Sequence, residues 1–497
     1  MELILAGFAD AVTPLSLLCI VVGTVVGVIV GVLPGLGSVV GITMVLPFTF
    51  TMPQVPSIAL MLGVYCGSVY GGSITAIVLN TPGTPQAAAT VLDGFPMAQR
   101  GDADLAIGWV TASSTLGGLF SILVLIVAAP YLAAFSLQFT PIEYFAVGIF
   151  ALTCIANVSK GALLKGLLSG LAGLIIATVG TDPVTGDLRF TFDIFELSAG
   201  FDLIPVVVGL FAFTEMFVRA AERWTPDTTV NFRVGFRLPP LREWRGRLGV
   251  LLRGCAIGSF VGALPGTGAA TAAFIAYSEA KRTSKNKDNF GKGEPDGLIA
   301  CESANNAVTG SALVPTLALG VPGDPVTAVM LGALVIQGVT PGPQLFSNEI
   351  QLVYAIFLVL ILVNLAMFAT GALGAQLFTR VLRIPEPLLI GLVLVIAMIG
   401  TYGVRGNVLD IWLALAAGAV GAVMRFSGFP IAPMVIGMVL SPMIEQSLRQ
   451  GLVITRGSFL AFFERPIALT LILLTVGVLL WPIIRMLRER HTGRGAS

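Results

Sequence analysis

The sequence predicts an all-α polytopic membrane protein. Of its 497 residues, 56% are hydrophobic and 11% are charged, whereas soluble domains usually carry about a quarter charged residues. Apolar runs rich in Leu, Val, Ile and Ala approach the length of about 20 residues that a helix needs to cross a bilayer. The 58 glycines and 29 prolines lie among these apolar runs and not in polar low-complexity stretches. Together these observations exclude a soluble globular protein and a disordered one.

Several of the apolar runs are too short to cross, so we expect broken helices and about 11–13 membrane segments. In the first half the runs lie near 15–33, 37–50, 57–79, 105–129, 142–157, 161–179 and 201–220. In the second half they lie near 248–264, 267–279, 297–320, 325–339, 351–375, 386–402, 407–425, 429–444 and 466–485.

Three groups of residues recur in the same order, which predicts an internal duplication. The matching segments are Gly31–Gly37 with Gly262–Gly268, Thr81–Pro85 with Val321–Pro325, and Pro205, Gly209 and Glu215 with Pro433, Gly437 and Glu445. We therefore divide the chain into a first repeat, an Arg-rich cytoplasmic linker, a second repeat, and an extra C-terminal transmembrane helix with a basic cytoplasmic tail. These four parts are 1–220, 221–247, 248–450 and 451–497.

The distribution of Lys and Arg predicts the orientation, because basic residues favour cytoplasmic loops. None occurs before Arg100, whereas the linker, the loop Lys281–Lys292 and the tail Arg485–Arg494 are strongly basic. We expect a multi-pass protein of the bacterial inner membrane with a periplasmic N-terminus and a cytoplasmic C-terminus. The first repeat then begins outside and the second inside. Such an inverted structural repeat is typical of secondary transporters.

Residues 248–280 run from one basic loop to another, so the chain enters and leaves on the same side. Each arm of this segment is shorter than the hydrocarbon core of about 30 Å. A re-entrant hairpin with its tip at Leu264–Gly268 is therefore expected. Residues 15–50 are expected to form the matching hairpin from the opposite face, with its tip at Leu33–Gly37.

Both tips and both Pro-Gly breaks are candidate binding sites for an anion. Helix N-termini present unpaired backbone N–H groups and a partial positive charge, and Asn or Thr side chains add donors suited to a carboxylate. The alternative is that these residues form kinks or tight helix crossings, but their duplication favours a functional role. The candidate substrate-binding residues are Gly35, Gly37, Ser38, Asn80, Thr81, Gly83, Thr84, Gly266, Thr267, Gly268 and Gly323.

A polar stripe in the second half is the candidate site for ion coupling. The spacing of Glu302, Asn305, Asn306 and Thr309 places them on one helix face, and such a stripe inside a membrane indicates a pathway or an ion site. One alternative is interhelical hydrogen bonding; another is that Glu302 reaches headgroup water near the cytoplasmic loop. Asp324 is either a cation ligand or the N-cap of the run 325–339. The cation expected at these residues is Na⁺ or H⁺.

Enzymatic chemistry is not supported by the remaining residues. The single histidine, His491, lies in the C-terminal tail, and the five cysteines have no metal-ligand spacing. Neither a His-x-x-x-His nor a Gly-x-Ser-x-Gly constellation is present. We expect no enzyme, no catalytic residue and no cofactor beyond the coupling cation. The net charge of +1 gives no indication of nucleic-acid binding.

Seven motifs in succession resemble the large membrane subunit of tripartite tricarboxylate transporters. They are GVLPGLG, YCGSVYGGSITAIVLNTPGTP, LDGFPMAQRGD, GALPGTG, FGKGEPDG, ESANNA and LALGVPGDP. This resemblance implies carboxylate uptake driven by an ion gradient, with a periplasmic solute-binding protein and a small four-helix membrane subunit as partners. Thr84 stands where many relatives carry an acidic residue, so the selectivity of this chain is expected to differ.

The energetics of anion uptake support coupling to cations. Moving a trianion inward against about 100 mV costs roughly 7 kcal/mol, at about 2.3 kcal/mol per charge. The chain has no G-x-x-x-x-G-K-[ST] motif for nucleotide binding. Symport with Na⁺ or H⁺ is therefore expected. The alternative function is a stand-alone organic-anion carrier or channel.

Overall fold

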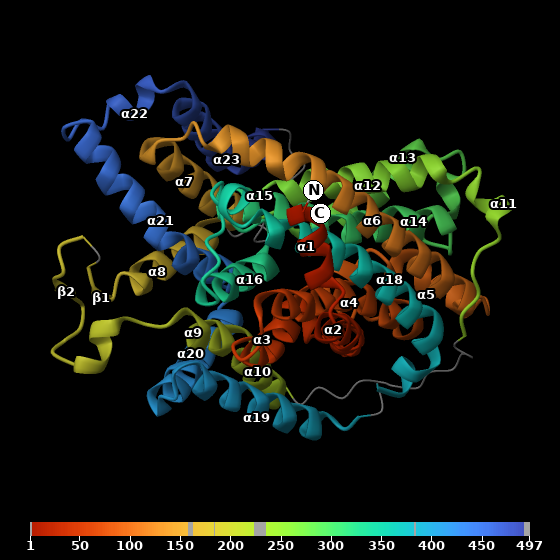
Figure 1. Ribbon diagram of the computed structural model, residues 1–497. Coiled ribbons are helices and arrows are strands. Elements are labelled where there is room, and N and C mark those ends of the chain that lie inside the picture. The colour runs from red at the N-terminus through yellow and green to blue at the C-terminus, as the bar shows by residue number, and fades with distance from the viewer. Residues whose placement is uncertain (1, 158–162, 183, 223–234, 382–383, 492–497) are drawn as a thin grey trace. The chain divides into compact units, whose positions relative to one another are not determined.

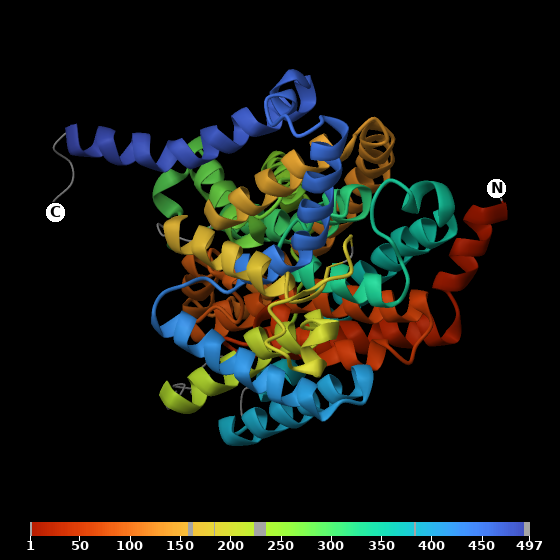
Figure 2. The same ribbon diagram turned by 90° about the vertical axis from the view of Figure 1, so that its left-hand side faces the viewer.

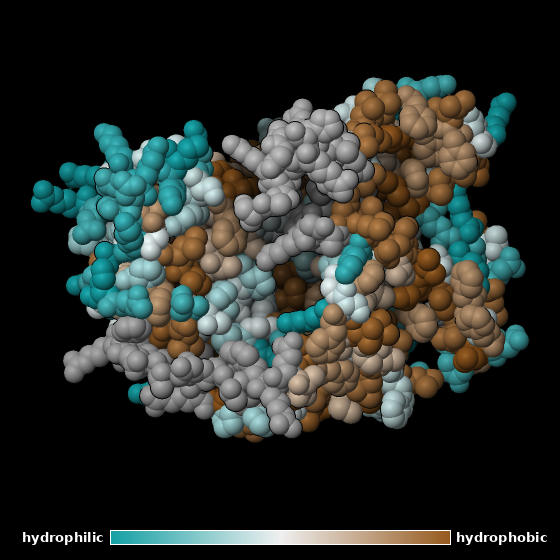
Figure 3. Space-filling model, turned by 180° about the vertical axis from the view of Figure 1, so that it is seen from behind, coloured by the Kyte–Doolittle hydropathy of each residue, from teal (hydrophilic) through white to brown (hydrophobic). Residues whose placement is uncertain are grey.

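The computed structural model describes residues 2–157, 163–182, 184–222, 235–381 and 384–491, and these residues are mostly helical (Figures 1 and 2). Within the described residues, six helices are long and apolar enough to cross a membrane, and seven further apolar helices are shorter. Large apolar side chains occupy wide areas of the surface seen in Figure 3, as expected of helices that face lipid. The predicted all-α polytopic membrane class is confirmed.

The elements of the first half follow the predicted apolar runs closely. They are α1 (Glu2–Ala11), α2 (Pro14–Val32), α3 (Gly37–Thr49), α4 (Gln54–Leu79), η1 (Pro85–Ala87), α5 (Val91–Gln99), α6 (Ala103–Ser136), α7 (Pro141–Asn157), α8 (Leu163–Ala177), β1 (Gly180–Thr181), β2 (Leu188–Arg189), η2 (Phe195–Ala199), α9 (Leu203–Val208), η3 (Gly209–Phe213) and α10 (Thr214–Glu222). The antiparallel strands β1 and β2 and the short helices α1 and α5 lie outside the predicted runs.

The second half begins after the linker, of which residues 235–247 belong to the described chain. Its elements are α11 (Leu241–Trp244), α12 (Leu248–Ala263), α13 (Gly268–Thr283), η4 (Lys287–Asn289), α14 (Pro295–Ser311), α15 (Leu313–Leu319), α16 (Pro325–Ile336), α17 (Leu345–Asn348), α18 (Ile350–Val381), α19 (Glu386–Arg405), α20 (Val408–Phe426), α21 (Ala432–Ile454), α22 (Ala461–Glu464) and α23 (Pro466–His491). The helix breaks at both predicted tips are confirmed, whereas membrane re-entry stays a prediction.

The chain forms two compact units, each of which combines segments from both halves. The large unit consists of Met1–Ala133 and Ile204–Val423, and the small unit consists of Ala134–Leu203 and Met424–Ser497. The two compact units therefore do not coincide with the two predicted repeats, 1–220 and 248–450.

Small residues allow close helix packing in the large unit. Gly23, Gly27 and Gly31 of α2 lie directly against the backbone of α4, where an added Cβ would clash. Gly254, Gly258 and Gly262 of α12 lie in the same way against α14. Close approach through small residues is a common way for membrane helices to associate. The two hairpins, α2–α3 and α12–α13, are therefore each packed on the long helix that follows them.

The small unit packs α21 against α7 and α8. Gly437 of α21 lies against the backbone of Gly170, and Gly173 of α8 lies against that of Met434. Gly209, which matches Gly437 in the sequence, packs in the large unit against Ala414 of α20. The matched glycines thus have the same role of close helix contact within their separate units.

Candidate functional site

In each half the tip of the hairpin is hydrogen-bonded to the Pro-Gly loop of the same half. The backbone N–H of Gly35 donates to the carbonyl of Gly83 at 3.2 Å. The backbone N–H of Gly266 donates to the carbonyl of Gly323 at 2.7 Å. These residues are far apart in the chain, and the fold brings them together twice in the same way.

The tips require glycine because their backbone is left-handed. Gly35 and Gly37 have φ of +85° and +69°, and Gly266 and Gly268 have φ of +84° and +71°. Residues with a Cβ avoid this region, whereas glycine enters it without penalty. The two tips therefore share one backbone conformation. Thr267 of the second tip donates its hydroxyl to the carbonyl of Leu264 at 3.1 Å.

The loops require glycine because other backbone atoms lie against them. A Cβ on Gly83 would clash with the carbonyl of Gly31 and with the Thr75 hydroxyl. A Cβ on Gly323 would lie 2.5 Å from the carbonyl of Ala312. Close packing therefore holds both loops against the helices beside them.

The polar side chains of the first loop differ in exposure. Asn80 is the C-cap of α4 and has a left-handed backbone conformation. The side chains of Asn80 and Thr81 are both exposed. Thr84 is buried, and so is Ser38 at the start of α3. Neither the Thr84 nor the Ser38 hydroxyl has a hydrogen-bond partner within the described chain. Buried polar atoms are normally satisfied, so these two unpaired hydroxyls are unusual, and the role of Ser38 and Thr84 in substrate binding stays a prediction.

Asp324 in the second loop is the N-cap of α16, as one of the two sequence interpretations predicted. Its Oδ1 accepts a hydrogen bond from the backbone N–H of Thr327 at 2.7 Å, and the Thr327 hydroxyl accepts from the N–H of Asp324 at 2.9 Å. This reciprocal arrangement is a capping box. Oδ2 accepts from the hydroxyl of Tyr65. Thr84 occupies the matching position in the first half with a similar extended backbone, but its side chain does not cap η1.

Glu302 is fully buried, so the interpretation that it reaches headgroup water is wrong. Its carboxylate accepts hydrogen bonds from Ser73 of α4 at 2.7 Å, from Ser114 of α6 at 2.8 Å, and from the hydroxyl of Thr90. No Lys or Arg of the described residues pairs with it. The alternative of interhelical hydrogen bonding therefore applies to Glu302, whose oxygens accept from three hydroxyl groups, and its role in ion coupling stays a prediction.

The other three residues of the stripe form hydrogen bonds along α14. The side-chain amide of Asn306 donates to Oδ1 of Asn305 at 2.6 Å, and the hydroxyl of Thr309 donates to the carbonyl of Asn306 at 2.7 Å. All three side chains are buried. The carbonyl oxygen of the Asn306 side chain has no partner within the described part of the chain. The helix predicted for the stripe is confirmed, and its role stays a prediction.

One buried carboxylate that our sequence interpretation left without a role is Asp93 in α5. Its Oδ1 accepts the backbone N–H groups of Gly291, Gly293 and Glu294, each at 2.8 Å, and Oδ2 accepts from the hydroxyl of Tyr277 at 2.9 Å. Asp93 belongs to the motif LDGFPMAQRGD, and its backbone partners belong to FGKGEPDG. The two motifs therefore meet, with Asp93 as the anchor of the loop before α14.

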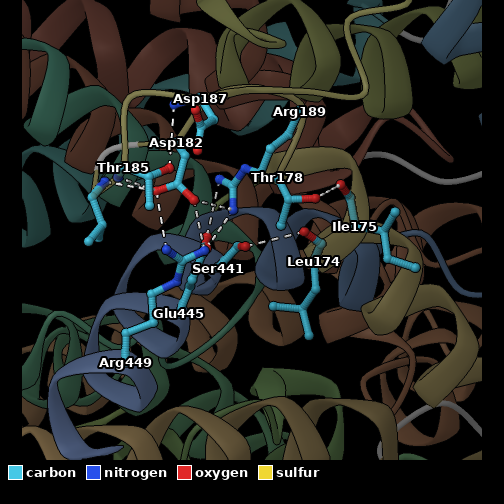
Figure 4. Close-up of polar contacts among 11 residues, drawn as sticks. Leu174, Ile175, Thr178, Asp182, Thr185, Asp187, Arg189, Ser441, Glu445 and Arg449 are labelled. Atoms are coloured by element: carbon cyan, nitrogen blue, oxygen red, sulfur yellow. Dashed lines mark hydrogen bonds and ion pairs between the residues drawn. The ribbon is translucent and has the colours of Figure 1, made fainter. Parts of the chain in front are cut away.

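The small unit contains a charged cluster in which the β1–β2 hairpin is bound to α21 (Figure 4). Arg449 contacts Asp182 at 2.8 Å and Glu445 at 2.7 Å, and Arg189 contacts Glu445 at 2.5 Å. The backbone N–H groups of Val184 and Thr185, together with Arg449, hold the pKa of Asp182 to about 2 against the opposing effect of desolvation. A pocket of about 530 Å³ borders the cluster.

Comparison with known proteins identifies the family. A model of the tripartite tricarboxylate transporter TctA family matches residues 17–436, which include both tips, both loops and α14. The chain belongs to this family. It is therefore a multi-pass membrane protein of a transporter family, and the resemblance inferred from the seven motifs is confirmed.

Two proteins that are similar to this TctA family member come from Agrobacterium vitis. The protein described as "Uncharacterized 52.8 kDa protein in TAR-I ttuC' 3'region" is 36% identical over 487 residues, which cover 97% of each chain. The protein described as "Uncharacterized protein in TAR-II ttuC' 3'region" is 36% identical over 236 residues, covering 47% of this chain and 98% of the relative. No solved structure matches the chain.

Proposed function

We propose that the chain is the large translocating subunit of a binding-protein-dependent secondary transporter that imports organic carboxylates by symport with Na⁺ or H⁺. Membership of the TctA family supports the general function. The observation that carries the proposal for this chain is the contact between tip and loop, Gly35 with Gly83 and Gly266 with Gly323. Interrupted helices of this kind bind the substrate and the coupling ion in many secondary transporters.

The substrate is bound at the tips and loops. Donors are the backbone N–H groups at the N-termini of α3 and α13 and the unpartnered hydroxyls of Ser38 and Thr84. An array of N–H and O–H donors suits a carboxylate, which accepts hydrogen bonds on both oxygens. Asn80 and Thr81, which are exposed, contact the substrate as it enters or leaves the loop.

The coupling cation is bound at Glu302 or at its neighbours on α14. A carboxylate buried among hydroxyl groups without a basic partner gains from a proton or a Na⁺ ion, because an isolated buried charge is unfavourable. The carbonyl oxygen of the Asn306 side chain and the Thr309 hydroxyl are further oxygen ligands. Asp324 has both carboxylate oxygens engaged by Tyr65 and Thr327, so its primary role is to fix the second loop.

Transport proceeds by alternating access between two inverted repeats in the bacterial inner membrane. The matched conformations of the tips and the matched glycine contacts of α2 and α12 support the duplication. The partners are a periplasmic solute-binding protein, which delivers the substrate, and a small four-helix membrane subunit. The chain is a transporter subunit and not an enzyme.

Uptake of radiolabelled carboxylates by cells that express the chain with both partners tests this proposal. Accumulation is expected to need an ion gradient, the small subunit and the binding protein encoded beside the chain. Undiminished uptake after deletion of the binding protein would favour a stand-alone carrier or channel. Asn305→Ala and Thr81→Ala are expected to abolish uptake without lowering membrane abundance, and normal uptake by both variants would exclude the proposed site.

A further inference from the structure

A buried ion pair of α10 contacts the tip of the first hairpin. The Nε of Arg219 donates to Oε1 of Glu215, one helical turn earlier, at 2.9 Å. Its Nη2 donates to the backbone carbonyl of Pro34. The two side chains are only 8% and 7% exposed. Among the residues that the structure describes, Arg219 is the only buried Lys or Arg.

The guanidinium of Arg219 lies directly against the backbone of the tip. A Cβ added to Gly35 would lie 2.5 Å from Nη2 of Arg219 and 3.0 Å from Oε1 of Glu215. Gly35 also donates its N–H to Gly83. The tip is therefore held at two successive residues, at Pro34 by the ion pair and at Gly35 by the first loop.

General stability does not explain an arginine at this position. A buried ion pair loses much of its attraction to desolvation, and well-packed apolar residues often stabilise a core as well or better. The guanidinium instead provides several donors in a fixed plane, so it can bind Glu215 and a backbone carbonyl together. Its contacts specify the position of the tip.

The residues of the second half that match Glu215 and Arg219 lie in the small unit and bind a different partner. Glu445 and Arg449 of α21 have the same spacing as Glu215 and Arg219, and they also form an ion pair. Arg449 binds the side chain of Asp182 as well and so helps to hold the β1–β2 hairpin (Figure 4). Arg449 therefore provides a matched control for the contact between Arg219 and the tip.

We propose that Arg219, oriented by Glu215, is a positioning residue for substrate binding. It fixes the tip Leu33–Gly37 so that the N-terminus of α3 and the unpartnered hydroxyl of Ser38 face the substrate. This inference rests on the proposed function, because it assigns a role to a residue that supports the proposed substrate site. Arg219 acts through the tip and makes no contact of its own with the substrate.

Transport kinetics of Arg219→Gln test the proposal, with Arg449→Gln as the control. Losing one charge-assisted hydrogen bond to the tip is expected to raise the KM for substrate by about tenfold, with a smaller change in the maximal rate. Arg219→Lys keeps the charge and a donor nitrogen but loses the planar fork of the guanidinium, and it is expected to recover part of this loss. Glu215→Gln keeps the shape of the acceptor and is expected to have an intermediate effect. An unchanged KM in Arg219→Gln and Glu215→Gln would overturn the proposal.

Thiol labelling measures the position of the tip independently of transport. In a background without the five native cysteines, Ser38→Cys takes a buried position in the first turn of α3 and is expected to react slowly. Addition of Arg219→Gln is expected to increase the labelling rate about tenfold, whereas Arg449→Gln leaves it unchanged. Equal rates in all three proteins would refute the positioning role. If labelling changes but the wild-type protein carries no carboxylate, the proposed function fails and the contact to the tip stands.

Discussion

The hydroxyl of Tyr65 donates a hydrogen bond of 2.5 Å to Oδ2 of Asp324 in the core of the large unit. Tyr65 lies on α4 of the first half, and Asp324 lies in the Pro-Gly loop of the second half. Both side chains are buried. Oδ1 of Asp324 accepts from the backbone N–H of Thr327 at the start of α16. The carboxylate of Asp324 therefore links α4 of the first half to α16 of the second half.

Tyr65→Phe is expected to destabilise the large unit. The substitution removes the donor to Oδ2 and leaves a buried carboxylate oxygen unpaired, which costs about 1–3 kcal/mol. Thermal unfolding of the purified protein in nanodiscs measures the loss. Tyr131→Phe is the control, because Tyr131 is 76% exposed. Equal stability of the two variants would show that the bond contributes nothing.

Glu302→Gln is expected to abolish accumulation of substrate but to preserve exchange. Gln keeps the size of the side chain and an acceptor for Ser73, so the fold is retained, but it cannot bind a proton and attracts Na⁺ weakly. Uptake driven by an ion gradient, compared with substrate exchange at equal ion concentrations, measures this difference. The exposed carboxylate of Glu196 provides the control Glu196→Gln. Normal accumulation by Glu302→Gln would exclude Glu302 from coupling.

Gly83→Ala is expected to disrupt the contact between the first tip and its loop. The added methyl group would clash with the carbonyl of Gly31 and with Thr75, which costs about 1–3 kcal/mol of strain. We expect a lower unfolding temperature and reduced uptake. Gly391→Ala in α19 is the matched control, because apart from its own helix backbone and adjacent residues no atom lies within 4 Å of the added Cβ. Similar behaviour of the two alanine variants would contradict the close packing of the loop.

The β1–β2 hairpin is expected to detach from α21 in acid. The pKa of Asp182 is lowered from 3.8 to about 2 in the folded protein, so its stabilising effect is present above pH 3.8 and is lost as the pH falls toward 2. A spin label at Leu188→Cys measures mobility of the hairpin between pH 7 and pH 2. Asp182→Asn is expected to mobilise the label already at pH 7, whereas Asp187→Asn, which alters an exposed residue, is not. A label that is equally rigid in all three proteins at pH 7 would contradict this role.

Local signals in the sequence predicted the helices and their interruptions. Proline withholds a backbone N–H and glycine permits left-handed φ, so the breaks at Leu33–Gly37 and Leu264–Gly268 were visible from residue type alone. The position of Asp324 before the run 325–339 allowed two interpretations, a cation ligand or an N-cap, and the structure shows the N-cap. Each of these features depends on a few neighbouring residues.

The contacts of the candidate site could not be predicted because they join residues far apart in the chain. The donors to Glu302 come from α4, from α6 and from Thr90, and nothing in the spacing of α14 selects them. Glu215 was noted for its match with Glu445, but the contact of Arg219 with Pro34 depends on how α10 packs beside the first tip. A hydrophobic pattern predicts which face of a helix is buried, but it does not predict which other helix packs against that face.

The distribution of basic residues predicts that the two halves begin on opposite sides of the membrane. The basic residues concentrate at 221–247, at Lys281–Lys292 and in the C-terminal tail, and these segments are expected to be cytoplasmic. Cysteines introduced at Leu5 and at Lys285, in a background without native cysteines, should then react from opposite sides. A membrane-impermeant thiol reagent applied to intact spheroplasts is expected to label Leu5→Cys, whereas Lys285→Cys reacts only after the membrane is opened. Labelling of both from one side would exclude the inverted repeat, because the first hairpin would then enter from the same face as the second.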